Sequence, residues 1–190
     1  MQEARRKPRA DALRNRSKLI DAAKEILGRG GPEASLEAVA REAGVGIATL
    51  YRNFPTREDL FHAVYAHEAE HLVELAQQLS GQDDKLGALR DWVHALIDVV
   101  ATKRGMLGTL AMVPTDESKA MFAAQGGRMK EAGAALLAAA VESGSVRPDI
   151  TGDELMSTIY GLCYAQPAQP GWQDKVLKLI DIFLDGLRRG

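Results

Sequence analysis

Two short helical patterns lie on either side of a glycine turn between residues 35 and 53, and this spacing constrains the fold more than any other feature of the sequence. Ser35 is a favourable helix N-cap, and an apolar stripe at helical spacing follows it, formed by Leu36, Val39, Ala40 and Ala43. Gly44 ends this pattern, and a second one runs from about Gly46 to Asn53. These dimensions are typical of a helix-turn-helix, although plain helical hairpins of this kind also arise by chance in alanine-rich sequences.

The second of these patterns has an unusual composition for a surface helix. Leu50 and Phe54 are expected in the core, yet the face expected to be exposed carries the apolar Ile47. This composition favours a face that contacts a partner, and the residues of the helix alone leave the partner open.

Helical patterns account for the rest of the chain and predict an all-α fold with about nine helices. Ala, Leu, Glu, Arg and Lys are frequent, and 46 % of the residues are hydrophobic, so a core can form. No segment has the pattern of a strand. The helices are expected over about 9–27, 36–43, 46–53, 56–79, 85–101, 104–112, 117–143, 152–165 and 171–188.

Charge is distributed unevenly along the chain. Twelve basic and seven acidic side chains up to residue 57 give this segment a net charge of +5, and the total of −2 leaves −7 for the remainder. A basic segment beside an acidic one favours docking of a polyanion at the basic end. Arg5, Arg6, Lys7 and Arg9 are expected to form a basic arm that follows a DNA backbone or enters its minor groove; a merely solvated tail is the alternative.

Several other classes of protein lack their usual signals here. The single cysteine, Cys163, allows no intramolecular disulfide and favours a reducing compartment, and neither a membrane-length apolar run nor a secretory signal is visible, so a cytoplasmic protein is expected. His67 and His71 have the i, i+4 spacing of a helical metal site, but no HExxH order and no third ligand accompany them. A metal-dependent enzyme is thus a remote alternative, and we expect no catalytic residue, bound metal or cofactor.

The stretch SLEAVAREAGVGIATLYRNFPTREDLFHAV resembles the N-terminal domain of the TetR family of transcriptional regulators. The similarity extends from about Leu19 to Val64, and the remaining two-thirds resembles the family only in its helical pattern. It implies a DNA-binding helix-turn-helix domain over 1–60 and a helical effector-binding and dimerisation domain over 61–190. It also implies that the helix from Gly46 to Asn53 is the recognition helix.

The resemblance assigns DNA-contacting roles to ten residues. Base edges would be read by Gly46, Ile47, Ala48, Thr49, Arg52 and Asn53. Phosphates would be contacted by Tyr51 and Arg57, as at the matching positions of the family, and by Ser35 and Thr56 at helix N-termini. For Tyr51 simple packing is the alternative, and Arg52 could instead extend into solvent.

The family resemblance also implies a homodimer and a small-molecule pocket. Two apolar faces are expected to form the dimer interface, Leu155, Ile159 and Leu162 on one helix and Val176, Leu179, Ile180, Phe183 and Leu187 on the next, unless they pack only within their own subunit. The pocket is expected to draw on Trp92, Leu96, Met106, Leu110, Met112, Phe122, Met129, Tyr160, Cys163 and Tyr164, each of which could also be plain core. For Cys163 a thiol sensor is the less common interpretation.

Together these features predict a repressor that binds a palindromic operator on double-stranded DNA and is released by a small, largely apolar effector. Release would follow from a tilt of the helix over 56–79, which joins the two domains. An activator or a non-specific architectural DNA-binding protein with the same N-terminal domain is the alternative interpretation.

Overall fold

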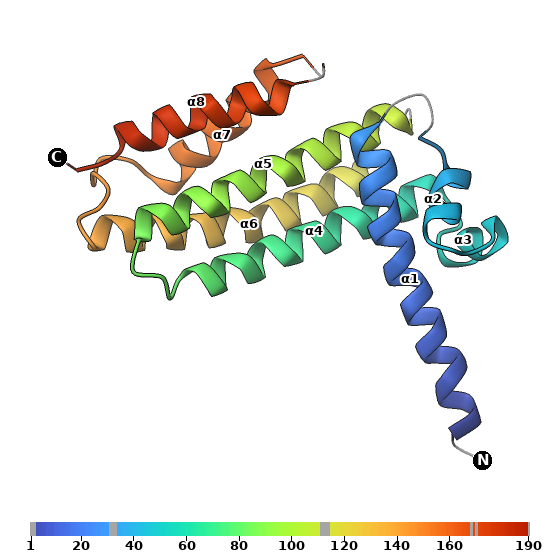
Figure 1. Cartoon of the computed structure of the whole chain (residues 1–190). Helices are drawn as coiled ribbons and strands as arrows, with labels where there is room; N and C mark the ends of the chain where they lie inside the picture. Colours follow the sequence, from blue (N-terminus) through green and yellow to red (C-terminus); the bar gives the residue numbers. More distant parts are fainter. Residues whose placement is uncertain (1–2, 31–33, 111–114, 168, 170, 190) are drawn as a thin grey trace. The chain divides into compact units, whose positions relative to one another are not determined.

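The computed structural model describes residues 3–30, 34–110, 115–167, 169 and 171–189, and this part of the chain contains eight α-helices and no strand (Figure 1). The helices are α1 (Glu3–Arg29), α2 (Leu36–Glu42), α3 (Ile47–Asn53), α4 (Arg57–Leu79), α5 (Lys85–Thr109), α6 (Asp116–Glu142), α7 (Gly152–Ala165) and α8 (Trp172–Gly186). The all-α prediction is confirmed. The count differs by one because the two helices expected over 85–101 and 104–112 form the single helix α5.

Helix α1 is also longer than its apolar stripe predicted. It begins at Glu3 instead of near Arg9, so the backbone of the expected basic arm is helical rather than disordered. The stripe marks only the part of a helix that packs against a core. A polar N-terminal extension carries no such periodic signal, and its start could not be located from the sequence.

The chain divides into two compact units whose boundary is not the one expected after residue 60. The first unit contains residues 1–67 and 102–114, and the second contains residues 68–101 and 115–190. Helices α4 and α5 therefore contribute residues to both units. The C-terminal turns of α5 belong with the helix-turn-helix segment, a long-range association that no local pattern in the sequence indicates.

Within the first unit, α1 and the last turns of α5 approach to backbone contact. A Cβ atom at Gly105 would lie only 1.7 Å from the carbonyl oxygen of Gly28, so this crossing has no room for a side chain. Thr109 Oγ1 also donates a hydrogen bond of 3.2 Å to the carbonyl oxygen of Leu27, one of the free carbonyls at the end of α1. This crossing and the buried side chains of Leu19 and Leu27 hold α1 in place.

Side-chain caps define where several helices begin. Thr56 and Asp59 form a capping box at the start of α4, in which Asp59 N donates to Thr56 Oγ1 at 3.0 Å and Thr56 N donates to Asp59 Oδ2 at 2.9 Å. Thr151 and Glu154 make the same reciprocal pair at α7, and Thr115 caps α6. Each such cap contributes about 1 kcal/mol and sets the first residue of its helix.

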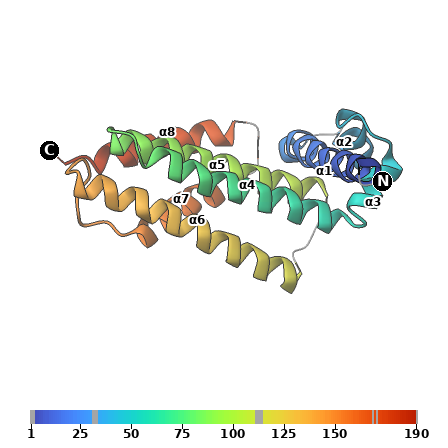
Figure 2. The ribbon, with the colours of Figure 1, turned by 90° about the horizontal axis from the view of Figure 1, so that it is seen from below.

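In the second unit, α7 and α8 lie on the side of α5 and α6 away from α4 (Figures 1 and 2). The core is centred on Trp92, which is fully buried and whose indole N–H donates to the Leu72 carbonyl oxygen at 3.0 Å. The ring packs on α6 at Gly133, where a Cβ atom would come within 2.5 Å of it. This tight packing fixes α5 against α4 and α6.

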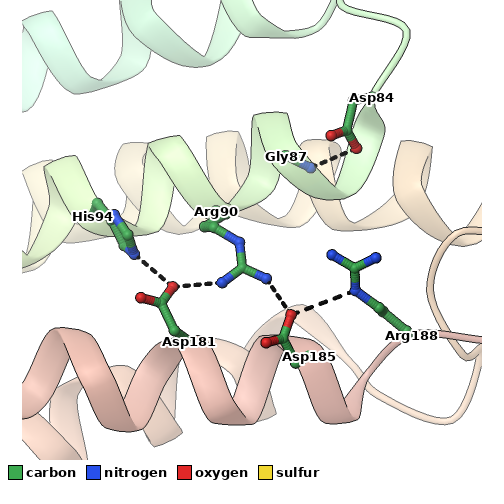
Figure 3. Close-up of polar contacts among 7 residues, drawn as sticks. All are labelled: Asp84, Gly87, Arg90, His94, Asp181, Asp185 and Arg188. Atoms are coloured by element: carbon green, nitrogen blue, oxygen red, sulfur yellow. Dashed lines mark hydrogen bonds and ion pairs between the residues drawn. The ribbon is translucent and has the colours of Figure 1, made fainter.

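A cluster of charged side chains holds α8 against α5 (Figure 3). The Arg90 guanidinium donates to Asp181 and to Asp185, both at 2.6 Å, and His94 Nε2 lies 2.9 Å from the same Asp181 oxygen. Partial burial opposes ionisation of Asp181, but the hydrogen bonds from His94 and Arg90 prevail and lower the pKa of its carboxyl group below the usual value. We refer to Arg90, His94, Asp181 and Asp185 as the α5–α8 clamp.

Candidate nucleic-acid interface

The segment from α2 to α3 is a helix-turn-helix with the caps expected from its sequence. Ser35 Oγ accepts a hydrogen bond of 3.1 Å from Ala38 N at the start of α2. Gly44 has a φ of +68°, a left-handed conformation that strains residues with a side chain, and it ends α2 as predicted. The backbone N–H of Val45 donates to the Ala40 carbonyl oxygen at 2.9 Å, and Gly46 then caps α3.

Helix α3 has one buried and one exposed side. Leu50 and Phe54 are each only 1 % exposed and fix the helix in the first unit, as expected. On the other side lie Ile47, 37 % exposed, and Tyr51, 48 % exposed, which are one turn apart. Ala48 and Arg52, also one turn apart and exposed, lie beside them. An exposed face that combines apolar, aromatic and basic side chains can contact both base edges and phosphates.

Two of the predicted base-reading side chains make hydrogen bonds within α3. Arg52 Nη2 donates to Thr49 Oγ1 at 2.9 Å, and Asn53 Nδ2 donates to the Thr49 carbonyl oxygen at 2.8 Å. Thr49 and Asn53 are half-buried, whereas Arg52 is exposed. Each of these two bonds uses a single donor, so Arg52 keeps further N–H groups, and Asn53 keeps its second amide N–H and its Oδ1, for contact with a base.

Three of the four predicted phosphate-contacting residues lie together. Ser35, Tyr51 and Arg57 line one depression of about 130 Å³, together with Glu37 and Thr109. Sequence reasoning missed Thr109, because it reaches this site from α5. The depression places a phenol, a guanidinium and the capped start of α2 within reach of one anion.

Thr56 is the fourth predicted phosphate-contacting residue, and its hydroxyl group is engaged. Thr56 Oγ1 donates to Asp59 Oδ2 at 2.7 Å and accepts from Asp59 N at 3.0 Å. The Asp59 carboxylate thus occupies the start of α4, where a phosphate would otherwise bind. Arg57, exposed at the same helix end, carries the positive charge of this site.

The residues expected to form a ligand pocket are divided between the two units. Met106 and Leu110 belong to the first unit, whereas Trp92, Leu96, Phe122, Met129, Tyr160, Cys163 and Tyr164 belong to the second, and Met112 lies outside the described residues. Trp92, Leu96, Met106, Met129 and Cys163 are fully buried. Burial, with a smaller effect of Tyr164 and Cys163, raises the pKa of Tyr160 to about 12, whereas Tyr164 is exposed.

The eight residues expected at a dimer interface divide into two groups. Leu155, Ile159, Val176, Ile180 and Leu187 are buried inside their own subunit and have no surface left for a partner. Leu162 and Phe183 are half-buried, and Leu179 is 41 % exposed. Sequence reasoning missed Ile182, which is 60 % exposed on α8. On a helix, Leu179, Ile182 and Phe183 share one side, which differs from the side that fills the core.

The two histidines considered as metal ligands are not part of a metal cluster in the described structure. His67 Nε2 lies 3.8 Å from Asp21 Oδ1, and the described residues contain no group of three His, Cys, Asp or Glu side chains suited to a metal ion. Among the helices of this part of the chain, none combines the length and the apolarity needed to cross a bilayer.

Comparisons with known proteins agree with this geometry. Residues 19–64 match the family model described as bacterial regulatory proteins, tetR family, and residues 85–189 match the model of the SbtR-like transcriptional regulator C-terminal domain. The uncharacterized HTH-type transcriptional regulator TtgW of Pseudomonas putida is 35 % identical over 99 residues, 50 % of this chain and 69 % of that protein.

Two solved structures have the same fold along nearly the whole chain. The TetR transcriptional regulator SCO0520 from Streptomyces coelicolor is 34 % identical, with a TM-score of 0.76 over 92 % of this chain and 98 % of its own. A TetR regulatory protein from Mycobacterium vanbaalenii is 27 % identical, with a TM-score of 0.71 over 95 % and 98 %.

Fold, site and relatives define a helix-turn-helix DNA-binding regulator of transcription and not an enzyme. The chain belongs to the TetR family of bacterial transcriptional regulators. The family resemblance drawn from residues 19–64 is thereby confirmed.

Proposed function

We propose that this regulator is a homodimeric repressor that acts in the cytoplasm, binds a palindromic operator on the nucleoid through α3, and is released by a small, largely apolar effector. The observation that carries the proposal is the exposed face of α3, formed by Ile47, Ala48, Tyr51 and Arg52 on a helix fixed by Leu50 and Phe54. A face that combines apolar, aromatic and basic side chains is suited to the major groove.

Different residues on and around the exposed face of α3 contact the bases and the phosphates of DNA. Ile47 and Ala48 offer methyl groups to thymine, and the exposed Gly46 allows close approach of the backbone. Thr49, Arg52 and Asn53 supply hydrogen bonds to base edges. Tyr51, Arg57 and Ser35 bind phosphate at the depression that they share.

A single α3 reads too few bases for a specific site, so two copies are required. The exposed apolar side of α8, with Leu179, Ile182 and Phe183, supports a two-fold interface with the same helix of a second subunit. The α5–α8 clamp lies on a different side of α8 and orients this face without contributing to it. Two α3 helices related by such an axis would read the two halves of a palindrome.

Release by an effector requires that the effector bind the DNA-incompetent conformation of the protein more tightly than the DNA-competent one. Helices α4 and α5 each extend through both units, so either one can carry a change in the second unit to the first. We retain α4 as the element that changes and add α5 because of its backbone contact with α1 at Gly28. Movement of these helices would alter the distance between the two α3 helices of the dimer.

Selection of binding sites from random double-stranded DNA with the full chain tests this function. We expect a palindromic sequence bound at about 10⁻⁸ M or better, with an affinity that falls steeply as salt increases. Equal binding to all sequences would instead indicate an architectural protein. A compound screen for release from the selected site, followed by a reporter gene carrying it, then separates a repressor from an activator.

A further inference from the structure

The second unit contains an open groove between α4 and α6 that none of the expected pocket residues lines. Its volume is about 330 Å³, within the range of small-molecule sites. The apolar lining consists of Val73, Ala76, Ala132, Ala135, Leu136 and Ala139. The alanines of α6 recur at helical spacing, so their short side chains leave space between two helices that lie as neighbours in Figure 2.

The contact between the Trp92 ring and α6 contrasts with this groove. The ring meets Gly133 so closely that a Cβ atom there would be 2.5 Å away, so no space remains between the ring and this part of α6. The groove is lined without any aromatic side chain, so it offers a ligand no ring on which to stack. Its α6 residues extend from Arg128 to Ala139, which spans about 17 Å along a helix, and this length suits a chain-like aliphatic molecule.

The charged side chains at the groove indicate the charge of the ligand's polar group. Arg128 donates to Glu70 at 2.6 Å and to Gln125 at 3.2 Å, so its guanidinium is already neutralised. Glu131 lines the groove and makes no hydrogen bond or ion pair with the residues that the structure describes. Two carboxylates beside one guanidinium leave one uncompensated negative charge at the mouth. Charge complementarity therefore favours a cation over an anion.

We propose that the α4–α6 groove binds a small amphipathic cation, with its aliphatic chain on the alanine lining and its ammonium group beside Glu131. The biological role of this site rests on the proposed release of DNA by an effector. Binding of the cation to the groove does not require DNA and can be measured on the protein alone. Because α4 and α6 both line the groove and α4 continues into the first unit, occupancy would act on the helix already proposed to change.

Isothermal titration of the full chain with decyltrimethylammonium, kept below its micelle concentration, tests the proposal. We expect one binding event per subunit, weaker binding of decyl sulfate, and an intermediate affinity for neutral decyl maltoside. Ala135→Leu fills the groove and should weaken decyltrimethylammonium binding by at least about tenfold. Ala138→Leu, at another alanine of α6 that does not line the groove, should bind as the wild type does.

Glu131→Gln should weaken decyltrimethylammonium binding by about threefold and leave decyl maltoside unaffected. Glu142→Gln, an exposed acid of α6 outside the groove, is the matched control. Equal affinities of the Ala135→Leu and Ala138→Leu proteins, tighter binding of decyl sulfate, or no binding by the wild type would each overturn the proposal. Binding-site selection on the ligand-free protein decides the proposed DNA function separately, so the two failures are distinguishable.

Discussion

Tyr51 and Asn53 lie two positions apart on α3, and their surroundings give them different tasks. Tyr51 is 48 % exposed beside Arg57 and Ser35, whereas the Asn53 amide is bonded to the Thr49 carbonyl oxygen. We expect Tyr51→Ala to weaken DNA binding about tenfold on every sequence, because a phosphate contact carries no sequence information. Fluorescence anisotropy on the selected operator and on scrambled DNA measures this loss.

Asn53→Ala should instead change the preferred base at one position of each half-site, with a difference of about 1–3 kcal/mol between bases. Thr49→Ala should alter preference in the same way. Tyr164→Ala removes a tyrosine of similar exposure, 52 %, from the second unit and should leave DNA binding unchanged. Equal losses on all sequences for the Tyr51, Thr49 and Asn53 variants would contradict this division of roles.

At the scale of single elements, the crossing of α1 and α5 is the least tolerant contact in the first unit. Gly105→Ala would place a methyl group on the Gly28 carbonyl oxygen and should lower the free energy of unfolding by about 1–3 kcal/mol. Gly108→Ala, one turn further along α5, meets no atom within 4 Å and should be neutral or stabilising by up to about 1 kcal/mol. Urea denaturation compares the two variants, and equal stabilities would disprove the close crossing.

The α5–α8 clamp also predicts that the stability of the protein depends on pH. Because the folded pKa of Asp181 is lowered, its contribution to stability is fully present above its usual value of 3.8 and is lost as the pH falls through the lower folded value. Asp181 is more than a third exposed, so we expect Asp181→Asn to cost no more than about 1 kcal/mol at neutral pH. The difference between the two proteins should vanish in acid. A difference that persisted or grew there would contradict this origin.

At the scale of the whole molecule, the exposed side of α8 predicts the state of assembly. Ile182→Asp places a carboxylate on this side and should yield monomers in sedimentation velocity, with operator affinity reduced at least about tenfold. Ala138→Asp introduces the same group at an exposed position of α6 and should remain dimeric. A dimeric Ile182→Asp protein would exclude α8 as the interface.

The all-α class and the helix-turn-helix were predictable because their signals are local. Ser35 and Gly44 act within four residues of chain and are found as expected, and the capping box of Thr56 and Asp59 is equally local. The extension of α1 to Glu3 and the fusion of two expected helices into α5 were not predictable, because polar helical turns have no apolar stripe to mark them.

By itself, the sequence determined the helical class, the glycine turn, the caps and the family, since all four depend on residues that are close together in the chain. Only the tertiary structure decided which apolar side chains are buried. Val176 and Ile180 are buried inside the subunit, whereas Leu179 and Ile182 are exposed on the same helix. The tertiary structure also brings Thr109 to the depression beside Tyr51, and it leaves a groove between α4 and α6. Helical periodicity marks several apolar positions on one helix, but the neighbouring helices determine which of them lose contact with water.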